Sequence, residues 1–458
     1  MSQRLLLSHA ARKRSRRLES IDIAGAFLKG FSFSEIQRAL REAGVDAPSR
    51  VVVLLPPLNV FRHLSDLSPD FKGMTDLQAM EYGLLCVKPV YGLNDAPLAW
   101  QLCLHQFVKQ HGGHPSHLDD CTFSWKGQRP EEPEAESIAT THVDDIALSG
   151  EQPWLDHMHQ LFLKRFGKVT RQTLPFVHCG CKYEKTPTGY KVSQQEFASK
   201  LRPVPVPERE DTSKLTKEEV STFRSILGAL LWLTATRLDI IADVSVLQAK
   251  VTVAEIQHLK QANDILIKVA EYIEVGLHYR MMEAKHIRLV CIHDASSAAQ
   301  GRSYAQEGLL IGIMEDKFHD VTLEAETEFQ DGEGEHGVEN HGGIFHILHA
   351  SGSKAKRISY STSHAETLSM VGGMEASTMI MVRLAELHHP AKAPTIKQLV
   401  QIQEAGDPKI PMDFYGDCRD LFELITGRRT LPQDKSQRLY VLSLKNQEFL
   451  ENCGWQLW

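Results

Sequence analysis

The sequence predicts an α+β protein made of two successive units. Up to about residue 200, short apolar segments alternate with amphipathic helices, which is typical of an antiparallel sheet covered by helices. A Pro-rich stretch at 202–212, RPVPVPEREDT, marks a boundary, and helical segments follow it. From residue 287 two strands come first and helices and strands then alternate, which indicates an α/β unit with a mixed sheet.

Local signals place the elements of the first part. Ile21 and Ile23 alternate with Asp22, which indicates a strand. Pro97 marks the first turn of a helix, and Thr216-x-x-Glu219 is a capping-box pattern at another helix start. The expected strands are 18–29 with its turn, a buried strand at 51–55, 121–125, 138–143, 146–150 and a hairpin over 176–192, and the expected helices are 97–110, 153–166, one from 216 and 253–274.

The last part carries an acidic segment between its strands. Ten Asp/Glu and one Lys lie in 315–340, so we expect an acidic insertion near 315–343 that projects away from any nucleic acid. The net charge is −7, and the residues outside that window sum to +2, so acidity does not exclude a basic channel. The expected elements are strands at 287–292, 308–314, 344–348, 358–361 and 411–415, a long helix over 363–387, and helices after Asp417 and near 436–452.

Composition favours an intracellular protein. The eight cysteines fit neither a zinc ribbon nor a disulfide scaffold, which favours a reducing compartment. No apolar run reaches the roughly 18 residues of a membrane helix, and Leu5–Leu7 is followed by charge rather than by a signal-peptide cleavage site. We expect a cytoplasmic location, with the nucleus as an alternative. The nuclear alternative, like a phosphate contact, rests on a basic cluster that is more often a solvated face: Arg12, Lys13, Arg14, Arg16 and Arg17.

Two adjacent carboxylates, Asp144 and Asp145, lie in a turn between apolar strands in THVDDIALSG. Asp is an ordinary turn former, and such a pair alone is more often a solvated turn than a metal site. Asp22, however, also follows a short apolar strand. Three acids at strand ends can share two Mg²⁺ ions, which prefer hard oxygen ligands, activate a hydroxyl nucleophile and stabilise a leaving group.

These segments resemble copia-type reverse transcriptases. IDIAGAFLKG at 21–30 is similar to the family's Asp-Val-x-x-Ala-Phe-Leu-x-Gly, and VKPVYGLNDAPLAW at 87–100 to its Leu-x-Lys-Ser-Leu-Tyr-Gly-Leu-Lys-Gln-Ala-Pro-Arg-Ala-Trp. THVDDIALSG is similar to its Tyr-Val-Asp-Asp box. FRSILGALLWLTATRLDIIADVS at 223–245 is similar to its Tyr-Arg-Ser-x-Val-Gly-Ser-Leu-Leu-Tyr-Leu-Thr-x-Thr-Arg-Pro-Asp-Ile.

The resemblance implies a polymerase palm over 1–185 and a thumb or connection over 186–285. Asp22, Asp144 and Asp145 would bind Mg²⁺ or Mn²⁺ and carry nucleotidyl transfer. The nucleotide would lie beside Tyr91, Gly92 and Asp95.

Three features depart from that family. His142 replaces the Tyr of the Tyr-Val-Asp-Asp box. Asp95 replaces a Gln that lies beside the incoming nucleotide, where a carboxylate repels triphosphate unless a metal or an Arg compensates. Only about twenty residues precede Asp22, so the fingers are expected to be truncated.

A second set of acids lies in the last part. Asp294 ends a strand, Glu366 lies in the first turns of a helix, and Asp417 ends a strand and begins a helix. Singly, Glu366 could be an ordinary helix N-terminal acid and Asp417 an N-cap. The order strand–acid, helix–acid, strand–acid is that of the ribonuclease H fold. HDAS, STSHAETLSM and GDCRDL also resemble the copia pieces Ser-Asp-Ala-Asp-Trp-Ala, Ser-Ser-Thr-Glu-Ala-Glu-Tyr and Asp-Asn-Gln-Ser-Ala.

This second resemblance implies a ribonuclease H-like domain over 286–458 with Asp294, Glu366 and Asp417 as metal ligands. The family's fourth acid falls on Arg438, with Asp434 nearby. The substrates would be an RNA or DNA template-primer, deoxynucleoside triphosphates (dNTPs) and RNA–DNA hybrid. Further partners would be the protease and integrase segments of a retrotransposon Pol polyprotein, which serve DNA integration.

Three other interpretations stay open. The main alternative is a degenerate, inactive retrotransposon remnant that at most binds nucleic acid. Another is a metal-dependent nuclease that uses only the C-terminal half. A metal site at His111, His114 and His117 is less favoured, because Gly-Gly and Pro in HGGHPSHLDDC indicate a loop.

Overall fold

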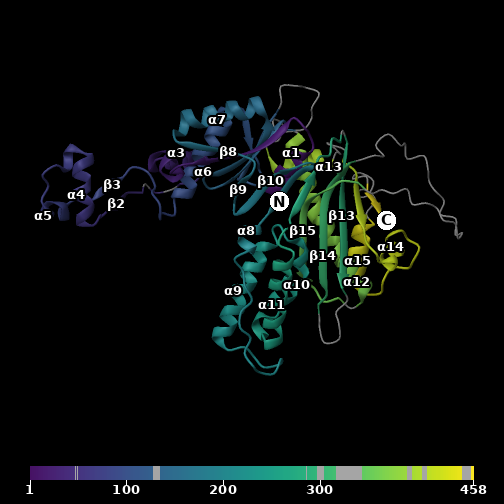
Figure 1. Cartoon of the computed structure of the whole chain (residues 1–458). Coiled ribbons are helices and arrows are strands. Elements are labelled where there is room, and N and C mark those ends of the chain that lie inside the picture. Colours follow the sequence, from purple (N-terminus) through teal and green to yellow (C-terminus); the bar gives the residue numbers. More distant parts are fainter. Residues whose placement is uncertain are drawn as a thin grey trace.

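The computed structural model describes the chain apart from residues 47, 49, 127–134, 285, 297–303, 316–342, 360, 389–394, 405–409, 446–454 and 458. The acidic insertion expected near 315–343 therefore lies almost wholly outside the described residues. Within the described part, the strands form four sheets, of six, four, five and two strands. The sheets are antiparallel or mixed and carry packed helices, which confirms the predicted α+β class (Figure 1).

A six-stranded antiparallel sheet occupies the region for which the resemblance predicts a palm, and we refer to this region as the palm. Its strand order is β4-β5-β6-β7-β1-β8, so β1 lies between β7 and β8. Apolar side chains from α6 and α7, among them Trp100, Phe107 and Phe162, form one core cluster with Ile21 and Ile146 of the sheet. The elements are β1 (Arg16–Ile23), α2 (Ala26–Lys29), α6 (Ala96–Gln110), β4 (Gly113–Pro115), β5 (Thr122–Trp125), β6 (Ser137–His142), β7 (Asp145–Glu151), α7 (Gln152–Phe166) and β8 (Val169–Thr173).

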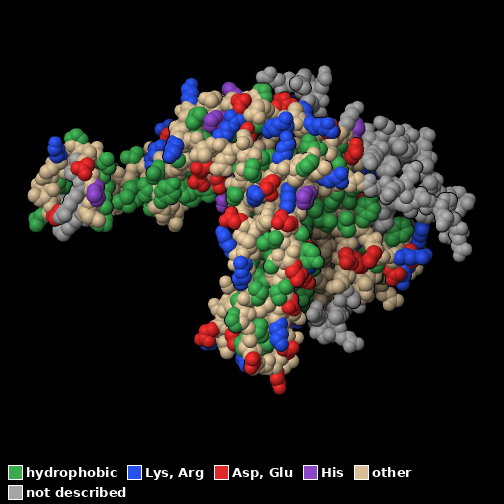
Figure 2. Space-filling model, in the orientation of Figure 1, with side chains coloured by type: hydrophobic (Ala, Val, Ile, Leu, Met, Phe, Trp, Pro, Cys, Tyr) green, Lys and Arg blue, Asp and Glu red, His purple; other side chains and the backbone are tan. Residues whose placement is uncertain are grey.

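Helix α3 lies beside α6, and the segment between α3 and α6 projects from the palm (Figure 1). The strand predicted at 51–55 is present as β2, but its predicted burial is wrong, because Val51 and Val53 are 73% and 52% exposed. β2 pairs with β3 alone among the described strands, and a two-stranded ribbon has no layer to cover it. Figure 2 shows hydrophobic side chains along the neck, the narrow part of this segment that joins it to the palm. The elements are α3 (Phe33–Glu42), β2 (Val52–Leu54), α4 (Leu58–Leu67), η1 (Pro69–Phe71), α5 (Asp76–Glu81) and β3 (Leu84–Cys86).

A four-stranded sheet and a helical unit follow. The predicted capping box is present, since Thr216 Oγ1 accepts from Glu219 N at 3.3 Å and Glu219 accepts from Thr216 N at 2.8 Å. The boundary predicted between 185 and 186 falls inside the β10–β11 hairpin. The elements are β9 (Phe176–His178), β10 (Cys181–Thr186), β11 (Gly189–Ser193), α8 (Gln195–Ala198), α9 (Lys217–Leu233), η2 (Leu238–Ile240), α10 (Ile241–Gln248), η3 (Val251–Val253), α11 (Ile256–Glu271) and β12 (Leu277–Arg280).

The C-terminal sheet is mixed, as predicted. Its order is β15-β14-β13-β16-β17, with β13, β14 and β15 antiparallel and β16 parallel to β13. The strand predicted at 358–361 is wrong: the described residues there lead into α12, and Ser361 Oγ accepts from His364 N at 3.1 Å. The elements are β13 (Ile287–Ser296), β14 (Gln306–Glu315), β15 (Phe345–Lys354), α12 (Thr362–His388), α13 (Ile396–Glu404), β16 (Met412–Tyr415), α14 (Arg419–Ile425), α15 (Lys435–Leu444) and β17 (Trp455–Leu457).

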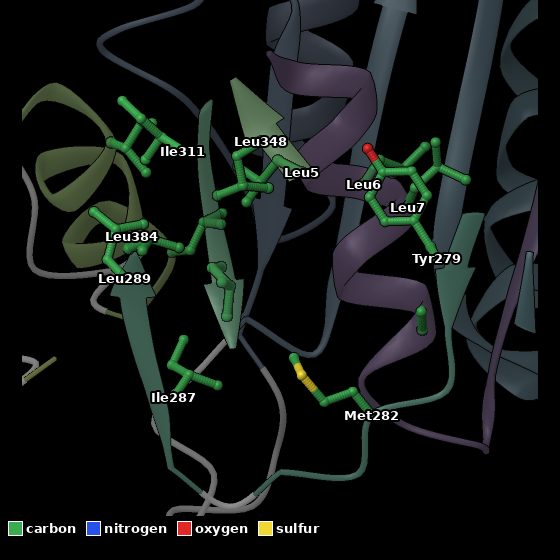
Figure 3. Close-up of a cluster of buried hydrophobic side chains, with 14 of the residues drawn as sticks. Leu5, Leu6, Leu7, Tyr279, Met282, Ile287, Leu289, Ile311, Leu348 and Leu384 are labelled. Atoms are coloured by element: carbon green, nitrogen blue, oxygen red, sulfur yellow. The ribbon is translucent and has the colours of Figure 1, made fainter. Parts of the chain in front are cut away.

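Helix α1 (Ser2–Ala11) joins these parts through a shared core. Leu5, Leu6 and Leu7 are at most 3% exposed and belong to one cluster with Tyr279 of β12 and Leu348 of β15 (Figure 3). Burying such side chains stabilises by about 1.5–3 kcal/mol each, so α1 fixes the palm against the C-terminal sheet. None of the helices in the described part is both long and apolar enough to cross a bilayer.

Candidate metal centres

The three C-terminal acids converge, as the sequence predicts. Asp294 lies near the end of β13, Asp417 follows β16, and Glu366 lies in the second turn of α12. Because β13 and β16 are adjacent and parallel, their carboxyl ends meet at one edge of the sheet. One carboxylate oxygen from each acid lies within 4.8 Å of the other two.

Glu366 is the buried member of this trio, 2% exposed. Its Oε1 accepts a hydrogen bond from Ala295 N at 3.1 Å, while its Oε2 is buried with no hydrogen-bond partner in the described residues. Burial and the nearby charges of Asp294 and Asp417 raise the pKa of Glu366 to about 7. A buried carboxylate with one oxygen free of hydrogen bonds, close to two other carboxylates, fits a divalent cation, and burial excludes the explanation of a solvated helix N-terminal acid.

His293 does not supply that missing positive charge. Its Nδ1 lies 3.8 Å from Glu366 Oε2, but burial lowers the pKa of His293 to about 4, so the ring is neutral at pH 7. Gly416 makes room for the ring: a Cβ at this position would lie 2.6 Å from the His293 Cε1 atom. His293 and Gly416 therefore pack closely together next to Glu366.

Asp434, the acid near the position expected for a fourth ligand, caps a helix instead. Asp434 is the N-cap of α15, where its Oδ1 accepts from Gln437 N at 2.8 Å. Gln437 Nε2 in turn donates to Ser363 Oγ at 3.1 Å, which ties α15 to the start of α12. For Asp417 the N-cap explanation is wrong, because Cys418 occupies the N-cap position of α14.

The palm acids are brought to one place but less tightly. Asp22 on β1 lies opposite Asp145 on β7, and Ile23 N donates to Asp144 O at 3.3 Å. Side chains directly opposite in antiparallel strands are neighbours, and like charges there are destabilising. Burial, then Asp144 and then Asp22, raise the pKa of Asp145. Among the described residues, only the C-terminal trio brings three potential ligand atoms within 4.8 Å of one another.

The Asp–Asp turn is strained and is held by a residue that sequence reasoning missed. Val143 has a φ of 60°, a left-handed conformation that is rare for a β-branched residue. The buried Trp100 of α6 donates from Nε1 to Val143 O at 2.5 Å. Trp100 ends the motif at 87–100, but only the fold reveals that it contacts the turn.

The predicted nucleotide-binding residues lie between the projecting segment and α6, and one of them contacts α2. The Tyr91 ring packs against Phe27 of α2, with 5.2 Å between ring centroids, and α2 follows Asp22 along the chain. Gly92 has a φ of 88°, which a glycine adopts freely. Asp95, at the start of α6, pairs with Arg50, so an Arg compensates its charge. Arg50 gave no signal in the sequence.

The histidines of HGGHPSHLDDC do not gather. The His111 ring packs edge-on against Phe107 at 4.6 Å between centroids. Among the described residues, His111, His114 and His117 do not bring three ligand atoms within 4.8 Å of one another.

The sequence of this chain is similar to that of a known polyprotein. The chain is 27% identical over 211 residues to the "Retrovirus-related Pol polyprotein from transposon RE1" of Arabidopsis thaliana. The chain is similar to a retrotransposon Pol polyprotein. This confirms the resemblance drawn from the motifs, although the match covers 42% of this chain and only 14% of the polyprotein. No protein-family model matches.

Two kinds of solved structure are also similar. A foamy viral protease-reverse transcriptase in complex with RNA/DNA hybrid aligns over 99% of this chain and 45% of that chain, with 11% identity and a TM-score of 0.45. RNase H1 from Halobacterium salinarum aligns over 37% of this chain and 83% of that chain, with 13% identity and a TM-score of 0.20.

Proposed function

We propose that the chain is the reverse transcriptase and ribonuclease H part of a copia-type retrotransposon polyprotein. It would extend a primer on an RNA or DNA template and hydrolyse the RNA strand of RNA–DNA hybrids. The observation that carries the proposal is the trio Asp294, Glu366 and Asp417, in which Glu366 Oε2 is buried without a partner. The similarity to the RE1 polyprotein supports the family.

At the C-terminal centre, three carboxylates would hold Mg²⁺ or Mn²⁺. A pair of such ions activates an attacking water and stabilises the leaving oxygen of a phosphodiester. The residues of the chain supply the geometry: Ala295 N orients Glu366, and the parallel strands β13 and β16 present Asp294 and Asp417. At the palm, Asp22, Asp144 and Asp145 would play the same part for nucleotidyl transfer.

Cleavage of a labelled RNA–DNA hybrid with Mg²⁺ tests the C-terminal half. Glu366→Gln should lower the rate by roughly a thousandfold or more, because ligands of one site act as a unit. Glu375→Gln is the matched control, since Glu375 is exposed on the same helix. Equal rates in wild type and Glu366→Gln would show that these acids do not form the active site.

Primer extension tests the palm separately. Asp144→Asn should lower extension by roughly 10²- to 10³-fold while hybrid cleavage continues, and Asp120→Asn, an exposed palm acid, should leave extension unchanged. If wild type extends a primer no better than Asp144→Asn, the polymerase half of the proposal fails.

A second candidate is a chain with ribonuclease H activity and an inactive palm. The observation that favours it is that the palm acids do not converge as the C-terminal acids do. His142 in place of the family's Tyr points the same way. The two assays separate this candidate, because it predicts hybrid cleavage that depends on Glu366 without any primer extension.

A further inference from the structure

The basic cluster at 12–17 divides into buried and exposed members. Arg12 and Arg16 are 9% and 4% exposed, and Arg16 Nη1 donates to His9 O at 2.9 Å. Burial and repulsion from Arg16 lower the pKa of Arg12 to about 9. Arg14 and Arg17, by contrast, are exposed. The solvated-face interpretation is therefore wrong for Arg12 and Arg16, whereas Arg14 and Arg17 do lie on the surface.

Arg14 and Arg17 line a cavity with two other cations. Lys185 of the β10–β11 hairpin and Arg280 at the end of β12 complete a cavity of about 620 Å³. Three chain segments that are distant in sequence thus place four positive side chains around one opening. We call this group, Arg14, Arg17, Lys185 and Arg280, the rear basic pocket.

Most of this charge has no acidic partner among the residues that the structure describes. Arg14 pairs with Glu283 at 3.3 Å. The Arg17 Nη1 atom donates to two backbone carbonyls, those of Arg14 and Arg16. Within the described residues, no carboxylate lies within ion-pair distance of Arg17, Lys185 or Arg280. Clustered cations that lack acidic partners attract an anion.

The pocket is built on a fixed scaffold. Thr188 O, in the two-residue turn between β10 and β11, accepts from Met281 N at 2.7 Å. A Cβ on Gly189 would lie 2.1 Å from Tyr279 O, so the hairpin is packed closely against β12. The Tyr190 hydroxyl donates to Arg16 O at 3.2 Å and ties the hairpin to β1. The backbone that carries these cations is therefore held in place before any ligand binds.

The pocket is remote from both metal centres. Arg17 and Asp22 lie on the same strand, and at about 3.4 Å per residue they are roughly 17 Å apart. Ile344, which also lines the pocket, precedes β15 at the end where Phe345 pairs with Met314. Asp294 lies at the other end of that sheet, opposite Gly308. The rear basic pocket is therefore a separate site.

We propose that the rear basic pocket binds phosphate groups of a nucleic-acid strand that lies outside both metal centres. The choice of a nucleic acid as the source of phosphate rests on the proposed function. The four cations, together with the hydroxyls of Thr186 and Thr188 on the pocket wall, suit several phosphates in a row rather than one isolated ion. Binding of this kind is independent of base sequence and sensitive to salt.

The test is binding of a fluorescently labelled single-stranded oligonucleotide to the full chain in EDTA, by anisotropy, over a range of salt concentrations. Lys185→Ala/Arg280→Ala should weaken binding several-fold at about 0.1 M salt. It should also reduce the magnitude of the negative slope of log K against log salt by about 1.4, or about 0.7 per lost phosphate contact on a single strand. Because EDTA removes catalysis from the measurement, this result is independent of whether either activity exists.

Two further variants and one competitor complete the design. Lys217→Ala/Lys397→Ala removes two exposed cations outside the pocket and should leave the slope unchanged. Lys185→Arg/Arg280→Lys keeps the charge and should restore binding. An unchanged slope in the alanine variant with an unchanged thermal midpoint overturns the proposal. So does a pocket that binds tripolyphosphate but contributes nothing to oligonucleotide binding.

Discussion

The two sets of acids differ in how the fold holds them. Asp294 lies on β13, and Asp417 follows the adjacent parallel strand β16. Glu366 lies near the start of the 27-residue helix α12. Asp144 and Asp145 stand in and beside a hairpin turn at the surface of the palm, opposite Asp22. The C-terminal acids are therefore preorganised by packed elements, whereas the palm acids depend on a turn.

This difference teaches that adjacency in sequence is a poor guide to convergence in space. Asp144 and Asp145 are neighbours in the chain, yet with Asp22 they do not bring three ligand atoms within 4.8 Å of one another. Asp294, Glu366 and Asp417 are separated by dozens of residues, yet they meet within 4.8 Å. The preorganised set also contains a buried carboxyl whose pKa is strongly raised, and the consequence for stability can be measured.

The largest expected difference is in stability against pH. The folded pKa of Glu366 is about 7, above the ordinary value of 4.5. Between these values the folded state binds more protons than the unfolded state, so the free energy of unfolding falls as pH rises. The loss is about 3 kcal/mol at most. Urea unfolding in EDTA at pH 5 and pH 8 should show it in wild type but not in Glu366→Gln.

Mg²⁺ and a control variant sharpen this test. Mg²⁺ would bind the ionised trio under the proposed function, so it should restore the stability of wild type at pH 8, with little effect on Glu366→Gln. His293, buried and neutral, contributes a loss of stability as pH falls below about 6.5 in both proteins, in the direction opposite to the effect of Glu366. The idea is wrong if Glu366→Gln and Glu375→Gln show the same pH dependence.

The next difference is in metal affinity without nucleic acid. Glu366→Gln should weaken Mn²⁺ or Mg²⁺ binding by at least roughly 10- to 100-fold, a loss that even outer-sphere changes produce. Asp22→Asn should have almost no effect, because the palm acids lack a third ligand atom within reach. Calorimetric titration of the metal measures both. Equal weakening by the two variants would abolish the distinction between the sites.

Much of this architecture was predictable from sequence, for definite reasons. Alternation around Asp22, Pro97 and the Thr216–Glu219 pattern are local signals, and the strands and helices that they predict are present. The strand predicted at 51–55 exists but is exposed, since burial depends on what a distant segment covers. The convergence of the three C-terminal acids was predictable because their order along the chain resembles that of a known fold. Arg50, Trp100 and His293 were not, because each acts through a contact that only the tertiary fold creates.

Trp100 should matter for the palm alone. Trp100→Phe removes the hydrogen bond from Nε1 to Val143 O, which contributes about 1 kcal/mol, and frees a strained turn. We expect kcat for primer extension to fall roughly tenfold with little change in the KM for dNTP, because Asp144 and Asp145 lose their fixed position. Hybrid cleavage should stay at the wild-type rate. A parallel fall in both activities would instead indicate a general loss of folding.

The smallest expected effect concerns Asp95, whose charge is unfavourable beside a triphosphate. Arg50 pairs with it across an exposed neck, and exposed ion pairs contribute little. Arg50→Ala should therefore raise the KM for dNTP only about threefold, through repulsion that falls with added salt. Arg50→Ala/Asp95→Asn should return KM to the wild-type value, since it removes the charge that Arg50 compensates. If the double variant is as impaired as Arg50→Ala, Arg50 contacts the nucleotide itself rather than acting through Asp95.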